Sequence, residues 1–330
     1  MHFPKKFKFK NIWKLFRDAG IGFSDDKVLK LSGSLAYFTV FSIGPMLIVI
    51  MFFADLFWGR EAVEGSIYGQ IKGFVGPEPA AQIQEIIKNV TLSGKSKVTA
   101  VIGFITLLIG ATTVFAEIQD SINTIWNLKV KPEKGFIKML INRLLSFSVV
   151  VGLGFLLLVS LVINGLLEAF SSRLLNVFPD IALITVYIIN LIITFIVITL
   201  LFSMIFKVLP DAKIKWKDVL VGSIVTAILF MIGKFGITFY IGSSDVDSTY
   251  GTAGALVVLL LWVYFTSVIL YFGAEFTKVY ATQFGSHISP NHYAVWIKQV
   301  EVEQGKGSLK LQEEKKKVEN EITGDNIKIT

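Results

Sequence analysis

Charged and amide side chains at the ends of long apolar segments are the residues of this sequence best suited to chemistry. Glu117, Asp120 and Thr124 stand at i, i+3 and i+7, so a helix places them on one face. Six residues are expected near those ends of the apolar segments that lie at the same level, namely Glu117, Asp120, Asn123, Trp126, Arg143 and Glu275. They predict a polar network between helices, which either contacts a substrate or pairs charges to fix the helix ends.

A second group of charges is predicted near the opposite side of the same apolar segments. It consists of Asp55, Glu168 and Lys234. Lys234 follows Lys217 by 17 residues, which is about 25 Å along a helix. An ionisable group inside a membrane costs roughly 2.5–3.5 kcal/mol on insertion scales, so these three residues are functional candidates. In the alternative, Lys234 extends its ammonium group to the membrane surface, and the two carboxylates lie among the headgroups.

The sequence lacks the residue types on which several other kinds of site are built. It contains no cysteine, which excludes disulfides, thiolate catalysis, iron–sulfur clusters and thiolate zinc sites. The three histidines, His2, His287 and His292, stand outside the long apolar segments, so an imidazole metal site is not expected. No obvious pair of nucleophile and base is present. We therefore expect a protein that is not an enzyme and that holds no metal and no cofactor.

The composition shows which elements must position these residues. Of 330 residues, 53% are hydrophobic and 17% are charged, whereas soluble domains carry about 25% charged residues. Six stretches are long and apolar enough to span a membrane as helices, which takes about 20 residues each. They are residues 35–57, 98–116, 144–167, 181–206, 217–241 and 253–277. The predicted fold is an all-α, polytopic membrane bundle of six transmembrane helices.

The basic residues between these stretches predict the orientation of the bundle. Segment 1–34 holds eight Lys/Arg, the second connection five and the fourth four, whereas the third holds one and the fifth none. Basic residues accumulate on the cytoplasmic side of membrane proteins, so both termini are placed in the cytoplasm. The same bias explains the net charge of +7 without a nucleic-acid partner.

The membrane domain, residues 35–280, is flanked by two segments that are expected in the cytoplasm. Four apolar residues of the basic segment 1–34 recur at helical spacing, namely Phe9, Ile12, Trp13 and Phe16. Their helix either lies among anionic lipid headgroups or packs on the cytoplasmic end of the bundle. Segment 281–330 is expected to be a polar tail. Within the membrane domain, Pro45 removes a backbone hydrogen bond and is expected to kink the first span.

Several motifs together resemble those of one family of bacterial membrane proteins. They are Ala36-Tyr37-Phe38-Thr39, Ser42-Ile43-Gly44-Pro45, Ser121-Ile122-Asn123-Thr124-Ile125-Trp126, Leu209-Pro210, Tyr250-Gly251-Thr252-Ala253-Gly254 and Gly273-Ala274-Glu275. This combination, spread over about residues 10–285, resembles the YihY/virulence factor BrkB family. The resemblance implies a six-helix integral protein of the bacterial inner membrane. Some members of the family bear a ribonuclease label, tRNA-processing RNase BN.

The resemblance leaves the molecular activity open, and the residues narrow it. A ribonuclease needs clustered acids and histidines and a basic soluble surface, and the membrane domain contains no histidine, so this activity is not expected. We expect transport, or transfer between leaflets, of a lipid-like or small amphipathic substrate. The main alternative is a non-catalytic scaffold or virulence-associated membrane protein that binds envelope proteins; a lipid-modifying enzyme with embedded carboxylates is less favoured. The sequence specifies no oligomeric state.

Overall fold

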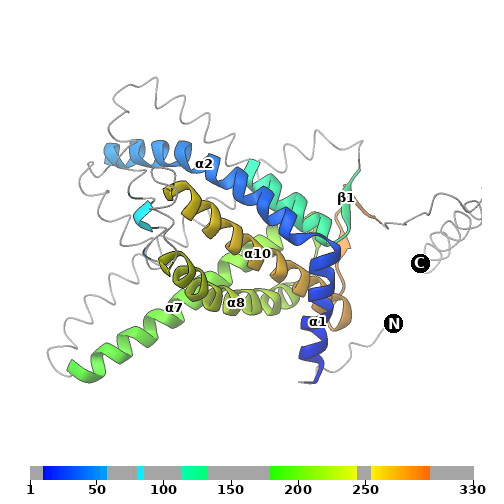
Figure 1. Ribbon diagram of the computed structural model, residues 1–330. Helices are drawn as coiled ribbons and strands as arrows, with labels where there is room; N and C mark the ends of the chain where they lie inside the picture. Colours follow the sequence, from blue (N-terminus) through cyan, green and yellow to red (C-terminus); the bar gives the residue numbers. More distant parts are fainter. Residues whose placement is uncertain are drawn as a thin grey trace, which may run out of the picture. The chain divides into compact units, whose positions relative to one another are not determined.

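The computed structural model describes residues 10–57, 113–131, 179–243 and 254–297, together with positions 77, 80–82 and 84. Its helices are α1 (Lys10–Asp25), α2 (Val28–Phe57), α7 (Pro179–Val208), α8 (Trp216–Ser243), α10 (Gly254–Gln283) and a helix over residues 113–125. α10 lies against α1, α2 and α8, and α8 also lies against α7 (Figure 1). α10 is therefore the element through which most of the described helices are connected.

Three helices in the described part of the chain are long and apolar enough to cross a membrane. They comprise Ile188–Val208 in α7, Trp216–Ile241 in α8 and Leu256–Gln283 in α10. Large apolar side chains such as Ile192, Ile228 and Phe235 are exposed on α7 and α8, as expected for surfaces that face lipid chains. The last three expected spans overlap these helices, with ends that differ by up to seven residues. The described part of the chain is thus mostly helical, as expected.

The first three expected spans are only partly described. α2 contains the first of them and begins earlier than expected, at Val28. It continues through Pro45 as one helix, and the expected kink stays a prediction. The second and third expected spans, 98–116 and 144–167, lie outside the described residues except for 113–116. The six-span topology therefore stays a prediction.

Two short antiparallel ribbons make the chain mostly, rather than wholly, helical. β1 (Leu128–Val130) pairs with β4 (Ala294–Trp296), and β2 (Ala212–Lys213) pairs with β3 (Ser289–Pro290). Strands of two or three residues leave no alternating pattern in a sequence, which is why an all-α fold was expected. The segment after α10 was expected to begin a polar tail. The ribbons pair it with the segment that follows helix 113–125 and with the segment that follows α7.

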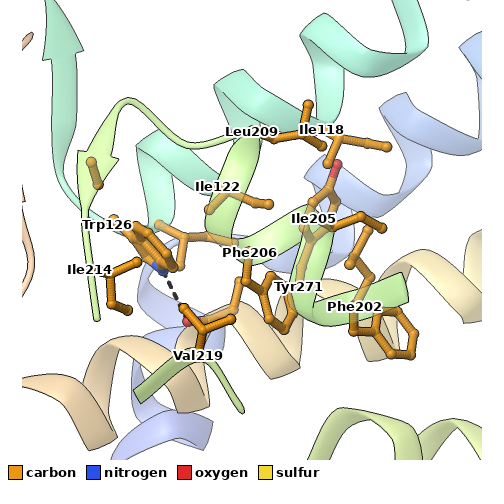
Figure 2. Packing of buried hydrophobic residues seen from close by; sticks show 14 of the residues in the cluster. Ile118, Ile122, Trp126, Phe202, Ile205, Phe206, Leu209, Ile214, Val219 and Tyr271 are labelled. Atoms are coloured by element: carbon orange, nitrogen blue, oxygen red, sulfur yellow. Dashed lines mark hydrogen bonds between the residues drawn. The ribbon is translucent and has the colours of Figure 1, made fainter. Parts of the chain in front are cut away.

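The main apolar core lies where helix 113–125 meets α7, α8 and α10 (Figure 2). Trp126, Tyr271 and Phe206 are its largest fully buried side chains. The ring N–H of Trp126 donates to the backbone carbonyl of Ala274 at 3.0 Å, a bond drawn dashed in Figure 2. Truncation of such aromatic residues to alanine costs about 3–5 kcal/mol, so this core fixes Trp126 and its segment on α10.

α8 and α10 approach each other closely through two reciprocal contacts between glycine and threonine. Gly222 on α8 lies against Thr277 on α10, and Gly273 on α10 lies against Thr226 on α8. A Cβ atom at either glycine would overlap the facing threonine hydroxyl. Each hydroxyl donates at 2.7 Å to a glycine carbonyl of its own helix, so the close contact leaves neither hydroxyl without a partner. Small residues of this kind allow membrane helices to pack tightly.

Candidate functional site

The amphipathic helix α1 lies on α10 and leads through a tight elbow into α2. Leu15 and Ala19 are buried against Phe276, and the ring of Phe16 lies 5.1 Å from the ring of Phe276. The other face of α1 is exposed, and Trp13 has 79% of its surface accessible. α1 thus packs on the helix bundle, which is one of its two expected arrangements, and presents Trp13 to the surroundings.

The elbow between α1 and α2 points an acidic side chain at α10. Lys27 has a φ of 52°, a left-handed conformation that costs a non-glycine residue about 1–2 kcal/mol. The N–H of Asp26 donates to the carbonyl of Gly22 at 2.9 Å, and the N–H of Lys30 donates to that of Lys27 at 2.9 Å. In this conformation Oδ2 of Asp26 accepts a hydrogen bond from Nζ of Lys278 at 3.1 Å.

Glu275 lies beside this ion pair and is fully buried, with 0% of its surface exposed. Neither carboxylate oxygen accepts a hydrogen bond from a residue that the structure describes. Its ionic partner is Lys278, whose Nζ lies 3.5 Å from Oε2. One ammonium group therefore serves two carboxylates. We call Asp26, Glu275 and Lys278 the elbow cluster.

Gly22 on α1 makes room for the Glu275 carboxylate. A Cβ atom at Gly22 would lie 2.7 Å from Oε2 and 3.0 Å from the carboxyl carbon of Glu275. A side chain at this position would have to displace either the carboxylate or α1 itself. The absence of a side chain is therefore what allows the backbone of α1 to lie directly against the carboxylate.

A second polar contact attaches α1 to the last turn of α10. Nε2 of Gln283 donates to Oδ2 of Asp18 at 2.8 Å. This hydrogen bond and the Arg17 guanidinium, 3.0 Å from Oδ1, hold the pKa of Asp18 below its ordinary value. Asp18 is therefore ionised at neutral pH, and its contact with α10 is maintained there.

A buried carboxylate also holds together the segments that the ribbons join. Asp211 is fully buried, and its carboxylate accepts hydrogen bonds from Nε2 of Gln119 at 2.9 Å and Nδ2 of Asn123 at 2.7 Å. Its backbone N–H donates to Oδ1 of Asn123 at 2.9 Å, and its carbonyl accepts from the N–H of Asn291 at 3.0 Å. Burial, together with the Asp211 carboxylate, raises the pKa of the Tyr293 hydroxyl. We call Asp211, Gln119, Asn123, Asn291 and Tyr293 the Asp211 cluster. Its hydrogen bonds hold these segments together as a structural clamp.

Asp218 in the first turn of α8 forms a similar contact with the chain that follows α10. Its Oδ2 accepts hydrogen bonds from the N–H of Ser286 at 2.9 Å and from Oγ of Ser286 at 2.6 Å. A Cβ atom at Gly285 would lie 2.6 Å from the Asp218 carboxylate, so a glycine is needed where the chain passes it. This contact fixes the end of α10 on the start of α8.

The residues predicted to form one polar network stand in separate environments. Asn123 belongs to the Asp211 cluster, Trp126 to the apolar core and Glu275 to the elbow cluster. Asp120 is exposed, and Glu117 is half-buried. Asn123, Trp126 and Glu275 are thus buried, and each contacts residues that the sequence did not indicate. A functional role for these residues stays a prediction.

The other predicted charges are described less fully. Lys234 is partly buried within α8, which continues past it without a break. Asp55 lies near the end of α2, where the structure describes the backbone and not the side chains. Arg143 and Glu168 lie outside the described residues. The meeting of Asp55, Glu168 and Lys234 near one membrane face therefore stays a prediction.

Sequence reasoning missed several residues of both clusters. Asp211 directly follows Leu209-Pro210, one of the motifs behind the family resemblance, so its position was a usable signal. Asp26 offered no such signal, because a charged residue near the end of a helix is common. Gly22 likewise has no recognisable motif around it. Its importance appears only from its contact with α10.

The chemistry available to the elbow cluster follows from its charges. It holds two acidic groups and one basic group, an imbalance that a bound cation or proton can neutralise. Among the residues that the structure describes, no group of three or more His, Asp or Glu side chains could hold a metal ion.

Comparison with known proteins places the chain among bacterial membrane proteins. The family profile described as Virulence factor BrkB matches residues 21–295. The UPF0761 membrane protein of Vibrio vulnificus is 32% identical over 264 residues, which cover 76% of this chain and 77% of that protein. The UPF0761 membrane protein of Cronobacter sakazakii is 30% identical over 264 residues, which cover 77% of this chain and 83% of that protein.

Other relatives are longer than the region they share with this chain. The UPF0761 membrane protein of Stenotrophomonas maltophilia strain R551-3 is 26% identical over 261 residues. The shared region covers 78% of this chain and 58% of that relative, so the chain spans little more than half of the relative's length. No solved structure matches the chain.

Proposed function

The chain belongs to the virulence factor BrkB family of membrane proteins, and from this premise we propose that it moves a lipid-like or small amphipathic molecule across the membrane or between its leaflets. The names of the relatives state no molecular activity. The observation that carries the proposal is the elbow cluster, in which Glu275 is enclosed by helices and receives no hydrogen bond from the described residues.

Glu275 is a costly residue if its only role is to stabilise the fold. Removal of a carboxylate from water costs several kcal/mol, and an ammonium group 3.5 Å away that also serves Asp26 offsets only part of this cost. Replacement of buried ion pairs by well-packed apolar residues is often neutral or stabilising. A transporter, in contrast, uses a buried charge whose surroundings change between states. The elbow cluster fits this second use better.

The proposal includes an arrangement of the chain in the membrane. We place six spans in the bacterial inner membrane, with both termini in the cytoplasm. We further propose that the protein is not an enzyme and holds no cofactor. α1 then lies at the cytoplasmic surface. Its exposed Trp13 suits the headgroup layer, and the exposed Lys14 and Arg17 suit anionic lipids.

Reconstitution of the purified protein into lipid vesicles tests the proposed function. Headgroup-labelled phospholipids and small labelled amphipathic ions serve as substrates, and a quencher that does not cross the membrane reports their transfer. We expect at least one substrate to move faster with wild-type protein than in protein-free vesicles. If no substrate of the panel moves faster, the proposal is rejected.

An envelope scaffold is the second candidate, and exposed aromatic side chains near the ribbons favour it. Trp216 is 54% exposed at the start of α8, and Trp296 is 53% exposed in β4. Tryptophan is enriched at protein interfaces relative to the rest of the surface. A photo-crosslinking residue at either position, used in living cells, would yield one discrete protein adduct for a scaffold. Adducts with lipid alone would reject this candidate.

A further inference from the structure

The elbow cluster has one more acidic group than its basic group can neutralise. Nζ of Lys278 is hydrogen-bonded to Oδ2 of Asp26 at 3.1 Å, whereas it lies 3.5 Å from Oε2 of Glu275. Asp26 is therefore the better-paired carboxylate. The surplus negative charge falls on Glu275, which is fully buried and has no hydrogen-bond donor in the described part of the chain.

The space beside Glu275 limits what can neutralise this charge. A single methyl group at Gly22 would already lie 2.7 Å from Oε2, so an organic ammonium group does not fit between α1 and the carboxylate. Calcium takes six to eight oxygen ligands, and the described residues provide no group of three ligating side chains. A proton needs no additional space, because it binds directly to a carboxylate oxygen.

We propose that Glu275 carries an exchangeable proton, shared with Asp26, that holds α1 on α10. In the protonated state the O–H of Glu275 donates to the Asp26 carboxylate, which stays paired with Lys278, and the cluster is neutral. When the O–H bond breaks, the proton passes to water and two carboxylates share one ammonium group. Their repulsion then weakens the attachment of the elbow to α10.

The other charged groups near the elbow do not take over this role. Asp18 on α1 is engaged by Gln283 of α10. Asp25 at the end of α1, Lys27 in the elbow and Lys30 at the start of α2 are exposed. Among the described residues of α8, no charged group acts on Glu275, so Asp26 and Lys278 are the groups that govern its proton.

In the proposed transporter, the proton on Glu275 would be the coupling ion, and this part of the inference rests on the proposed function. Binding of the proton itself does not depend on transport. Release of the proton would weaken the attachment of the elbow to α10, while the contacts of α1 with Phe276 and the hydrogen bond from Gln283 to Asp18 persist. Protonation of Glu275 would thereby determine how firmly α1 is attached to α10.

Infrared difference spectroscopy of the protein in vesicles measures this proton directly, because a protonated carboxyl group has a carbonyl stretch that a carboxylate lacks. Wild-type protein at neutral pH is expected to show such a band, which disappears as the pH rises. Glu275→Gln removes the band. Asp26→Asn removes the neighbouring negative charge, so the band disappears at a lower pH than in the wild type. Asp25→Asn, which alters an exposed carboxyl group next to the cluster, leaves the band unchanged.

A band that survives Glu275→Gln, or a wild-type spectrum without the band at neutral pH, overturns the inference. Glutamine has the size of the protonated acid and can also donate to Asp26, so the fold is expected to persist. If Glu275→Gln does not fold, Glu275→Asp is used to assign the band to residue 275. A change in the frequency of the band supports the inference, and an unchanged frequency refutes it. The spectra require no transported substrate, so a failed transport screen with an intact band rejects the transport function alone.

Discussion

Asparagine in place of Asp211 is the substitution that tests the structural clamp most sharply. The carboxylate accepts a hydrogen bond from Gln119 on Oδ1 and another from Asn123 on Oδ2. Asparagine has the same shape but only one side-chain oxygen, and its NH₂ group donates and does not accept. In the variant, this NH₂ group therefore faces the NH₂ group of either Gln119 or Asn123. One hydrogen bond is lost, and buried donors confront each other.

The expected cost of Asp211→Asn follows from these contacts. A hydrogen bond to a charged group contributes about 1.5–3 kcal/mol, and a buried polar group left without a partner costs about 1–3 kcal/mol. Asp211 is fully buried, so water does not replace the lost bond. We expect the free energy of unfolding to fall by about 2–4 kcal/mol. Against a typical total of about 5–15 kcal/mol, this is a large loss.

Thermal unfolding in detergent, followed by the amount of monodisperse protein that remains, measures the effect of Asp211→Asn. Asp120→Asn is the matched control, because Asp120 is an exposed carboxylate on the same helix as Gln119 and Asn123. We expect Asp211→Asn to melt several degrees below the wild type and Asp120→Asn to melt with it. Equal melting temperatures for Asp211→Asn and the wild type would refute the clamp.

Three further substitutions test contacts of α10 and of the core. Gly22→Ala places a methyl group 2.7 Å from Oε2 of Glu275 and is expected to loosen α1, so that a protease cleaves within α1 more rapidly; unchanged protease resistance would contradict the contact. Gly273→Ala overlaps the hydroxyl of Thr226 and is expected to cost about 1–3 kcal/mol in thermal unfolding, whereas wild-type stability would argue against the close approach of α8 and α10. Trp126→Phe removes the ring N–H bond to α10 and is expected to cost about 1 kcal/mol without altering substrate transfer in vesicles. A selective loss of transfer would show that Trp126 has more than a packing role.

The long helices could be predicted because a membrane span must be apolar along its whole length. α7, α8 and α10 meet this requirement, and hydropathy alone located them. The ends were harder to predict, because α10 continues to Gln283. Its last turns are stabilised by α1, through the Phe16–Phe276 contact and the bond from Gln283 to Asp18, and such contacts leave no hydropathy signal.

The clusters could be predicted only in part, because their partners are distant in the sequence. Glu275 was singled out as an acidic residue near the end of an apolar segment. Its neighbour Asp26 is 252 positions away from Lys278, the residue that joins them. Asn123 was likewise named without Asp211, which lies 88 positions further along the chain. Residue type identified candidates, whereas only the packed helices determined which of them meet.

The rate of substrate transfer by vesicles that contain Glu275→Gln is the most direct measure of the central claim, that the elbow cluster serves function rather than folding. Wild type, Glu275→Gln and Asp25→Asn are reconstituted at equal amounts of monodisperse protein. We predict that Glu275→Gln folds normally and loses transfer at every pH, because glutamine mimics the protonated state permanently, while Asp25→Asn transfers like the wild type. Transfer by Glu275→Gln at the wild-type rate, with the wild-type dependence on pH, would contradict the account.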